Sequence, residues 1–204
     1  MEAQRLSALH WFHLQAQARL QTFFGWQLPA WYTQPASEFA EVRASVGISD
    51  ASYLSKLDLR GPTGDLSLSP PARLWKLTSA HTLITSPLPI GFAASSSVTD
   101  VSSVYSAILL AGPKSREVLQ RLTTLSVREG AMPEGAARQT RLAHVNATIL
   151  RSDCAGLPGF LILNTRDVAE HVWHALLHAG VQFGIRPFGM VAQQQWMGFR
   201  HDAA

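Results

Sequence analysis

The stretch Ser49–Pro62, SDASYLSKLDLRGP, organises the expected fold because the chain writes it twice. The second copy is TDVSSVYSAILLAGP, from Thr99 to Pro113, and both copies pass from a hydroxyl residue and an Asp through an apolar segment to a Gly-Pro pair. The glycine ends a strand, and proline, with its fixed φ and no N–H, suits the first turn of a following helix. A unit repeated after about 50 residues predicts two related half-units around a pseudo-twofold axis.

Composition limits the classes of protein that this chain can belong to. Of its 204 residues 47% are hydrophobic and 15% charged, enough for a sizeable core in one large domain or two small ones. The net charge of +3 rests on scattered arginines, without the basic stripe of a nucleic-acid-binding face. The single Cys154 fits a reducing compartment, and no apolar run reaches the ~20 residues of a membrane span. With no signal-peptide pattern either, we expect a soluble cytoplasmic protein without nucleic-acid or membrane partners.

The first half of the chain predicts two helices around an aromatic segment. Residues 5–20 place apolar side chains and His13 on one side at helical spacing, which predicts an amphipathic helix. Residues 23–32, FFGWQLPAWY, are too broken by glycine and proline for a helix, and form either a lid over the core or an aromatic wall for a planar ligand. Residues 36–46 predict a short helix that ends at Gly47. Residues 64–97 are poorly patterned, with one helical turn expected at SPPARLWKL and a strand at HTLITSPLPI.

The second half alternates helices and strands. A helix is expected in KSREVLQRLT after Pro113, and the loop REGAMPEGAA is the expected seam between two lobes. Residues 139–151 alternate with period two, which predicts one strand, and residues 160–163 predict a buried strand. Asn164 is expected to cap a helix over 165–179, and a last short helix is expected near 190–200. The pattern predicts an α+β fold with mostly antiparallel sheets, a single domain over 1–204 with lobes near 1–130 and 131–204.

The candidate chemical groups mostly have structural interpretations. His171, His174 and His178 share a helix face at a spacing that could hold zinc, but no carboxylate or Cys completes a shell, so we expect solvated histidines and no metal site. His10 and His13 are interpreted in the same way, and Cys154 as an inert thiol. Asp50 and Asp100 could act as general bases or cap turns, and Arg141 and Arg151 could clamp a carboxylate or close the ends of a strand.

At this point the residues carry a family resemblance. Residues 28–62, preceded by FFGW, resemble the opening of the glycine-cleavage-system T-protein, an aminomethyltransferase. Residues 98–123 are similar to the second strand-Gly-Pro-helix unit of that family, and residues 137–180 to its following block. The chain is about as similar to the γ subunit of heterotetrameric sarcosine oxidase. The resemblance implies the aminomethyltransferase-like folate-binding fold, with two related lobes and a central cavity for tetrahydrofolate.

The chain also departs from the family pattern. The segment in which the T-protein keeps its catalytic Asp looks mostly deleted, and Asp65 is the one acidic residue over 64–97. The family motif Arg-Thr-Gly-Tyr-Thr-Gly-Glu-Asp-Gly-Phe-Glu is written RSDCAGLPGFL from Arg151, so Leu157 and Leu161 stand at the two Glu positions. A pterin's amino-pyrimidine edge needs a carboxylate acceptor, and burying it unpaired costs about 1–3 kcal/mol. The C-terminal barrel domain of the family has no counterpart in the sequence.

The resemblance therefore implies a truncated, catalytically degenerate relative that binds tetrahydrofolate or a similar ligand in one-carbon metabolism. No catalytic residue is assigned, because the catalytic and pterin-binding carboxylates are not found. For a folate site, Trp31 and Tyr32 would form the aromatic wall, Asp50 and Ser52 the cavity floor, and Arg151 and Arg141 the contact to the glutamate tail. The alternative is a non-catalytic γ-like subunit that packs against a larger flavin or folate enzyme, with apolar surface to cover.

Overall fold

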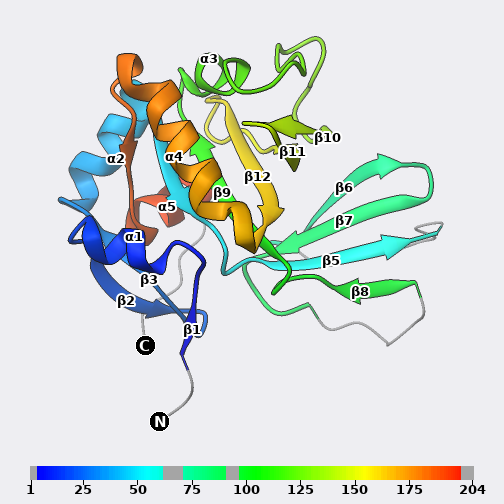
Figure 1. The fold of residues 1–204 in the computed structure, drawn as a ribbon, viewed down its shortest axis with the longest axis horizontal. Helices are drawn as coiled ribbons and strands as arrows, with labels where there is room; N and C mark the ends of the chain where they lie inside the picture. Colours follow the sequence, from blue (N-terminus) through cyan, green and yellow to red (C-terminus); the bar gives the residue numbers. More distant parts are fainter. Residues whose placement is uncertain (1–3, 62–70, 91–96, 199–204) are drawn as a thin grey trace.

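The computed structural model describes residues 4–61, 71–90 and 97–198. Figure 1 shows a body of sheets and helices from which a separate β-sheet projects to one side. The described strands form a three-stranded sheet of order β1-β3-β2, a six-stranded sheet of order β10-β11-β12-β9-β4-β13, and a four-stranded sheet of order β6-β7-β5-β8. The α+β fold class is confirmed, and the described residues form no barrel.

The N-terminal segment is mainly a β-hairpin and differs from the expected long helix. It consists of β1 (Arg5–Leu6), α1 (His10–Gln15), β2 (Arg19–Phe23) and β3 (Trp26–Trp31). The prediction of a helix over 5–20 is wrong, since Gln17 takes a φ of 56°, which stops the helix and turns the chain into β2. The aromatic segment 23–32 contains the end of β2, the turn and β3. Phe23, Trp26 and Leu28 are buried, which agrees with the interpretation of this segment as a lid over the core.

The two sequence repeats are two strand-turn-strand units that exchange strands. The first unit is β4 (Gly47–Asp50) and β5 (Ser55–Arg60), and the second is β8 (Val98–Asp100) and β9 (Tyr105–Ala111). The first strand of each unit pairs with the second strand of the other, β4 with β9 and β8 with β5, both antiparallel. Asp50 lies opposite Ile108, and Asp100 lies opposite Leu57, at corresponding positions of the two units. This reciprocal pairing confirms the pseudo-twofold arrangement.

Hydrogen bonds at the two turns repeat the same symmetry. Asp50 accepts from the backbone N–H of Ser52 at 2.9 Å, and Asp100 accepts from that of Ser102 at 2.8 Å, so both aspartates cap turns. The hydroxyl of Ser52 in turn accepts from the N–H of Ala107, and the hydroxyl of Ser102 accepts from the N–H of Lys56. Each serine therefore ties the turn of its own unit to the second strand of the other unit.

The described part of the segment between the repeats forms two strands. They are β6 (Arg73–Thr78) and β7 (His81–Ser86), which pair with each other, and β7 pairs with β5. The helical turn expected in SPPARLWKL is therefore wrong where it falls on β6; Ser69 and Pro70 lie outside the described residues. The order β6-β7-β5-β8 matches the inner order β11-β12-β9-β4 of the large sheet strand for strand, which extends the pseudo-twofold to whole sheets.

The alternating stretch 139–151 is a hairpin and not one strand. Its arms are β10 (Ala137–Leu142) and β11 (Val145–Arg151), joined by Ala143 and His144, both with positive φ. Two positive-φ residues are typical of a type I′ turn, which usually carries Asn-Gly, so the sequence gives no turn signal here. The large sheet continues through β12 (Gly159–Thr165), and takes strands from both sides of residue 130. The strands therefore do not divide at the expected lobe boundary.

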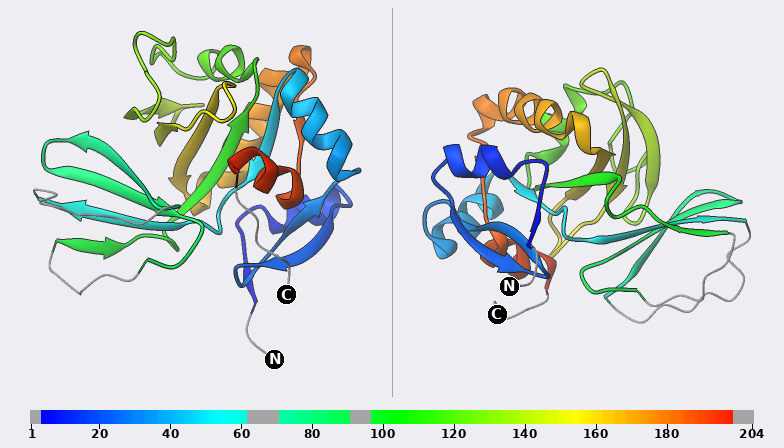
Figure 2. Two further views of the ribbon diagram at one scale, coloured as in Figure 1. Left: turned by 180° about the vertical axis from the view of Figure 1, so that it is seen from behind. Right: turned by 60° about the horizontal axis from the view of Figure 1, so that its bottom comes forward.

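Helices cover the large sheet on one face and complete the core on the other (Figure 2). They are α2 (Pro35–Ala44), α3 (Ser115–Gln120), α4 (Ala169–Gly180) and α5 (Met190–Met197). Alternate residues of β9 and β12 divide between two cores: Ile108 and Ile162 pack in the core that contains α3 and α4, and Leu109 and Leu161 in the core that contains α5 and β3. Asn164 lies in β12 and caps no helix, so that prediction is wrong; α4 begins at Ala169 after a 3-10 turn.

The glycines that close the two repeats have the same backbone conformation but different surroundings. Gly61 has a φ of +108° and Gly112 a φ of +113°, a region that favours glycine. A Cβ on Gly112 would lie 2.4 Å from the carbonyl oxygen of Val42 and 2.5 Å from that of Ser45, whereas a Cβ on Gly61 would meet nothing within 4 Å. Gly112 is therefore needed for the close packing of β9 against the end of α2.

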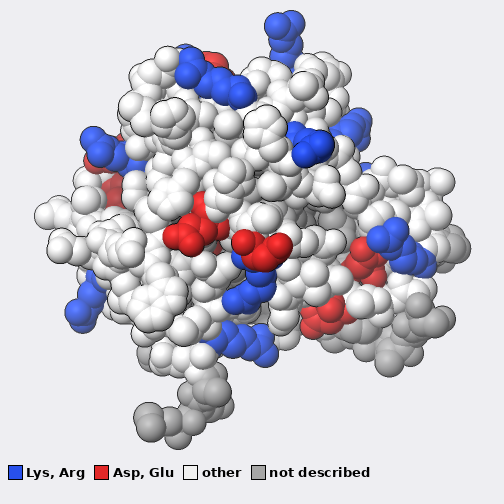
Figure 3. All heavy atoms as spheres, in the orientation of Figure 1, with Lys and Arg blue, Asp and Glu red and all other residues white. Residues whose placement is uncertain are grey.

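The described helices and the surface give two further constraints. Within the described ranges, no helix combines the length and apolarity that crossing a membrane would require. On the face shown in Figure 3, lysines and arginines lie in small groups separated by uncharged surface and by acidic residues.

Candidate functional site

A cavity of about 370 Å³ lies between the projecting sheet and the body. Its walls come from segments far apart in sequence: strands β6 and β7, the inner strands β9 and β12, the turn that follows β11, and the end of α5. The residues that carry its chemistry are Arg73, Trp75, Thr85, Ser86, Ser152, Asp153, Cys154, Trp196 and Met197, and Leu54, Leu109 and Leu161 form an apolar floor. A cavity of this size is within the range of small-molecule sites.

Two indole rings supply the aromatic part of the wall. Trp75 is 1% exposed, and its Nε1–H donates to the hydroxyl of Thr85 at 2.8 Å. Trp196 is 3% exposed, and its buried Nε1–H finds no hydrogen-bond partner among the described residues. A buried donor without a partner costs free energy.

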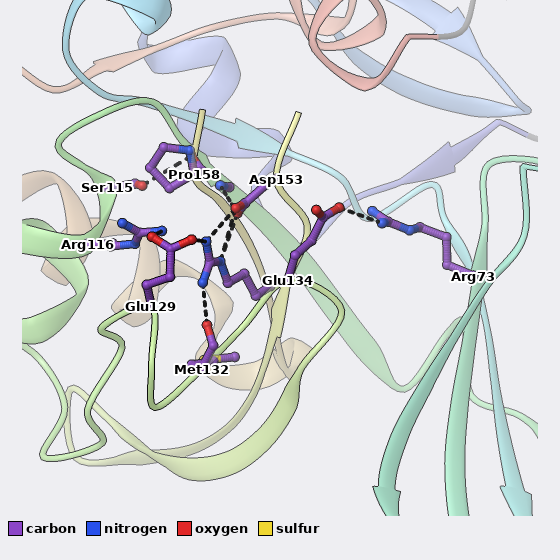
Figure 4. A network of polar contacts seen from close by, with 10 residues as sticks. Arg73, Ser115, Arg116, Glu129, Met132, Glu134, Asp153 and Pro158 are labelled. Carbon is purple, nitrogen blue, oxygen red and sulfur yellow. Dashed lines mark hydrogen bonds and ion pairs between the residues drawn. The ribbon is translucent and has the colours of Figure 1, made fainter. Parts of the chain in front are cut away.

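Arg73 is the one cationic side chain among the described residues that line the cavity, and it lies at the junction of the two parts of the molecule (Figure 4). Its guanidinium lies over the ring of Trp75, 5.0 Å from the ring centroid, and donates to the hydroxyl of Ser152. It also meets Glu134 at 3.4 Å, with both side chains about half exposed. Such an exposed, long ion pair contributes little stability, so the arginine can exchange partners.

Asp153 is the one acidic residue among the described residues that line the cavity, and its oxygens are already used. Arg151 donates to it from Nε and from Nη2, the latter at 2.6 Å, and the N–H of Gly159 donates at 3.2 Å. Arg151 also donates to the carbonyl of Met132, at 2.6 Å (Figure 4). The hydrogen bonds that Arg151 donates to Asp153 raise the pKa of the guanidinium. This pair is therefore a buried structural unit that holds the turn after β11.

Cys154 faces the cavity as a protonated thiol. Its Sγ donates to the carbonyl of Trp196, and burial raises the pKa of the thiol. The thiolate is the reactive form of cysteine, so the structure agrees with the expected inert thiol.

Two of the six predicted site residues, Tyr32 and Asp50, belong to a buried chain of hydrogen bonds away from the cavity. His13 Nε2 lies 3.0 Å from Asp50 Oδ2, and His13 Nδ1 lies 2.8 Å from the hydroxyl of Tyr32. The side chains of His13 and Asp50 are 0% exposed. Burial would raise the pKa of Asp50, but hydrogen bonds and the charge of His13 outweigh it and lower that pKa. Burial raises the pKa of Tyr32 well above its ordinary value.

None of the six predicted residues is among the described residues that line the cavity. Ser52 accepts a hydrogen bond from the N–H of Ala107 and so ties the turn between β4 and β5 to β9. Trp31 packs on the core that contains β3 and α5. Arg141 is exposed and donates to the carbonyl of His144 at 2.6 Å. Arg151 is committed to Asp153, so the structure brings together only Asp50, Ser52 and Tyr32, around His13.

The histidines divide into buried and exposed groups. The interpretation of His10 and His13 as solvated is wrong, because α1 packs that side against the body and leaves them 8% and 0% exposed. His171, His174 and His178 are exposed on α4, as expected, and the described residues contain no group of three metal-ligating side chains.

Comparison with known proteins decides the family. The family described as "GCVT N-terminal domain" matches residues 78–197, more than half of the chain. The chain belongs to this family. Relatives include the aminomethyltransferases of Saccharopolyspora erythraea and Symbiobacterium thermophilum, each 25% identical to it. The matches cover 93% and 94% of this chain but 62% and 63% of the relatives, so the chain spans about three fifths of their length.

Solved structures confirm the fold of the family. The glycine cleavage system aminomethyltransferase T of Bartonella henselae superposes with a TM-score of 0.74 over 96% of this chain and 62% of its own, at 18% identity. The heterotetrameric sarcosine oxidase of Corynebacterium sp. U-96, solved with pyrrole 2-carboxylate, gives a TM-score of 0.58 at 18% identity. That match covers 73% of this chain and 92% of the matched chain. Both resemblances inferred from sequence are thus confirmed at the level of fold.

Sequence reasoning did not find the residues of the cavity. Arg73, Trp75 and Trp196 lie in segments without a motif, and nothing in their spacing joins them. One signal was present: Cys154 and Leu161 occupy positions in the altered family motif, and both line the cavity.

Proposed function

We propose that this chain is a ligand-binding member of the aminomethyltransferase fold family. It holds tetrahydrofolate, or a similar acid, in the cavity between the four-stranded and the six-stranded sheet. The observation that carries the proposal is the cavity itself, enclosed by β6 and β7 on one side and β9 and β12 on the other. Its volume, its two indoles and its single arginine suit a planar ring system with an anionic group.

We propose further that the site does not transfer an aminomethyl group by itself. Aminomethyl transfer needs a carboxylate near the reacting nitrogen to handle protons. Asp153 is engaged by Arg151, and Leu161, at a Glu position of the family motif, faces the cavity as an apolar group. The described residues of β6 and β7 contribute hydroxyls, indole and arginine to the wall, and no acid.

The test is a titration of the purified protein with tetrahydrofolate and 5-formyl-tetrahydrofolate, followed by tryptophan fluorescence and by melting temperature. Trp75 and Trp196 line the cavity, so a bound ring system should quench their emission. Saturable quenching with a raised melting temperature is expected, because a ligand that binds only the folded state stabilises it. The absence of both effects at millimolar ligand would refute the folate proposal.

A second candidate is a non-catalytic subunit that packs against a larger flavin or folate enzyme. It is favoured by apolar side chains exposed near the N-terminus: Trp11 is 71% exposed, Leu6 44% and Leu14 43%. A large exposed aromatic side chain is typical of a protein–protein contact. The near-complete coverage of a chain from a heterotetrameric oxidase points the same way. Under this proposal Trp11→Ser would abolish co-purification with a partner and leave folate titrations unchanged.

A further inference from the structure

The polar groups that the cavity can offer to a ligand are hydrogen-bond donors. We propose that Arg73 is the anion-binding residue of the cavity, and that it holds the carboxylate of an aromatic acid whose ring lies against Trp75 and Trp196. The proposal rests on the proposed function in taking this cavity as the ligand site, and it adds which residue reads the ligand and which chemical class the ligand belongs to.

The acidic side chain of the cavity wall is already engaged, and the donors that can turn to a ligand are those of Arg73. Asp153 accepts from Arg151 and Gly159, and the hydroxyl of Thr85 accepts from Trp75. Among the described residues, the guanidinium of Arg73 donates to Ser152 and has a further, long contact to Glu134, so its remaining N–H groups can turn to a ligand. A ligand rich in acceptors would satisfy these donors, whereas an amino-pyrimidine edge would find no free carboxylate.

Arg73 is positioned to bind a planar carboxylate. Its stacking on Trp75 and its hydrogen bond to Ser152 fix the guanidinium at the cavity wall, which reduces the entropy lost when a ligand binds. The guanidinium fork matches a carboxylate bidentately, and such a pair is stronger than the 3.4 Å contact to Glu134. We expect the ligand carboxylate to replace Glu134 on Arg73.

The ring of the ligand is expected to meet the apolar part of the cavity. The floor of Leu54, Leu109 and Leu161 offers dispersion and no acceptor, and the indoles of Trp75 and Trp196 offer ring contacts. The class of ligand is therefore an aromatic or heteroaromatic carboxylate. The p-aminobenzoyl-glutamate portion of a folate belongs to this class, and an isolated pterin without a carboxylate does not.

The experiment uses isothermal titration of the full chain with three probes: p-aminobenzoyl-glutamate, its neutral diamide, and 6-hydroxymethylpterin. The variants are Arg73→Gln, Arg73→Lys and Glu134→Gln. Arg60→Gln serves as the matched control, since Arg60 lies in the same sheet, is 66% exposed and pairs with Asp58 away from the cavity. Arg73 is itself about half exposed, so its variants are expected to fold, which melting curves would verify.

We expect p-aminobenzoyl-glutamate to bind the wild type and to lose about 10-fold or more in affinity with Arg73→Gln. Arg73→Lys should keep part of that affinity, Glu134→Gln should raise it, and Arg60→Gln should leave it unchanged. The diamide and the pterin should bind weakly and equally to all variants. Equal affinity of wild type and Arg73→Gln for the acid, or preference for the pterin, would overturn the proposal.

The same titrations with 5-formyl-tetrahydrofolate separate this inference from the proposed function. Folate binding that is unaffected by Arg73→Gln would refute the role of Arg73 and leave the folate proposal standing. Arg73-dependent binding of the aromatic acid without folate binding would support the inference and refute folate as the ligand. Failure of every probe to bind the wild type would refute both.

Discussion

The two glycines that close the repeats offer a test in which each is the control for the other. Gly61→Ala and Gly112→Ala place the same methyl group on the same backbone conformation, since the φ angles are +108° and +113°. In Gly61→Ala the methyl group meets nothing within 4 Å, so the cost is backbone strain alone, about 1–2 kcal/mol. In a chain of this length that cost lowers the melting temperature by about 2–8 °C.

In Gly112→Ala the methyl group also collides with the main chain. Its Cβ would lie 2.4 and 2.5 Å from two carbonyl oxygens at the end of α2, so β9 or the helix must move by about 1 Å to reach ordinary contact. The carbonyl oxygen of Ser45 also accepts a hydrogen bond from the backbone N–H of Lys114 at 3.0 Å, and such a shift would strain this bond. We expect Gly112→Ala to lower the free energy of unfolding by more than about 4 kcal/mol, which is exceptional for a single substitution.

The assay is urea unfolding followed by circular dichroism, with thermal melts and the soluble yield of both variants. A large difference between the two variants is expected, with Gly112→Ala losing most of its folded population. If both variants lose the same free energy of unfolding, the close packing of β9 against α2 does not limit this position, and the reasoning is refuted.

Two further predictions concern buried charges. Asp50→Asn should lower the free energy of unfolding by about 3–5 kcal/mol, because it removes one partner of a buried pair with His13. It should also weaken the fall of the unfolding free energy at acid pH. Since the pKa of Asp50 is lowered in the folded state, its contribution to stability is present above the unfolded pKa near 3.9 and is lost as the pH falls through the folded value. The same loss of stability at acid pH in wild type and variant would contradict this. Burial lowers the pKa of Lys56 to about 8, so the unfolded chain binds more protons above that pH, and the unfolding free energy should rise between about pH 8 and 9.5. Lys56→Met should abolish this rise in urea titrations, and a rise that persists in the variant would have another origin.

The repeat was readable from sequence because its signals are local. The pairs Gly61-Pro62 and Gly112-Pro113 and the capping aspartates define each unit without reference to the rest of the chain. They predicted a pseudo-twofold arrangement, and the reciprocal pairing of β4 with β9 and of β8 with β5 confirms it.

Other elements were missed because long-range packing overrides local pattern. The helix expected over 5–20 stops at Gln15, since His10 and His13 must reach the body while β2 pairs with β3. The hairpin turn at Ala143 and His144 uses residues that do not favour positive φ, so nothing local reveals it. Pairing and burial in the whole fold decide both cases.

The candidate site was missed for a different reason. Its donors come from β6, from the turn after β11 and from α5, and only the closed fold brings Arg73, Ser152 and Trp196 to one cavity. The folate site implied by the family resemblance pointed to Arg151 and Trp31, which the structure uses for ion pairing and packing.

The exchange of strands between the repeats also governs how the chain can fold as it is synthesised. β4 cannot complete its pairing until β9 has emerged from the ribosome, about 60 residues later, and β9 then lies between β4 and β12, which comes later still. The first repeat therefore cannot complete its pairing before the second is made, since β4 pairs with β9, and β5 pairs with β8 as well as with β7. Folding should be slow, dominated by contacts of high sequence separation, and completed only after most of the chain is released.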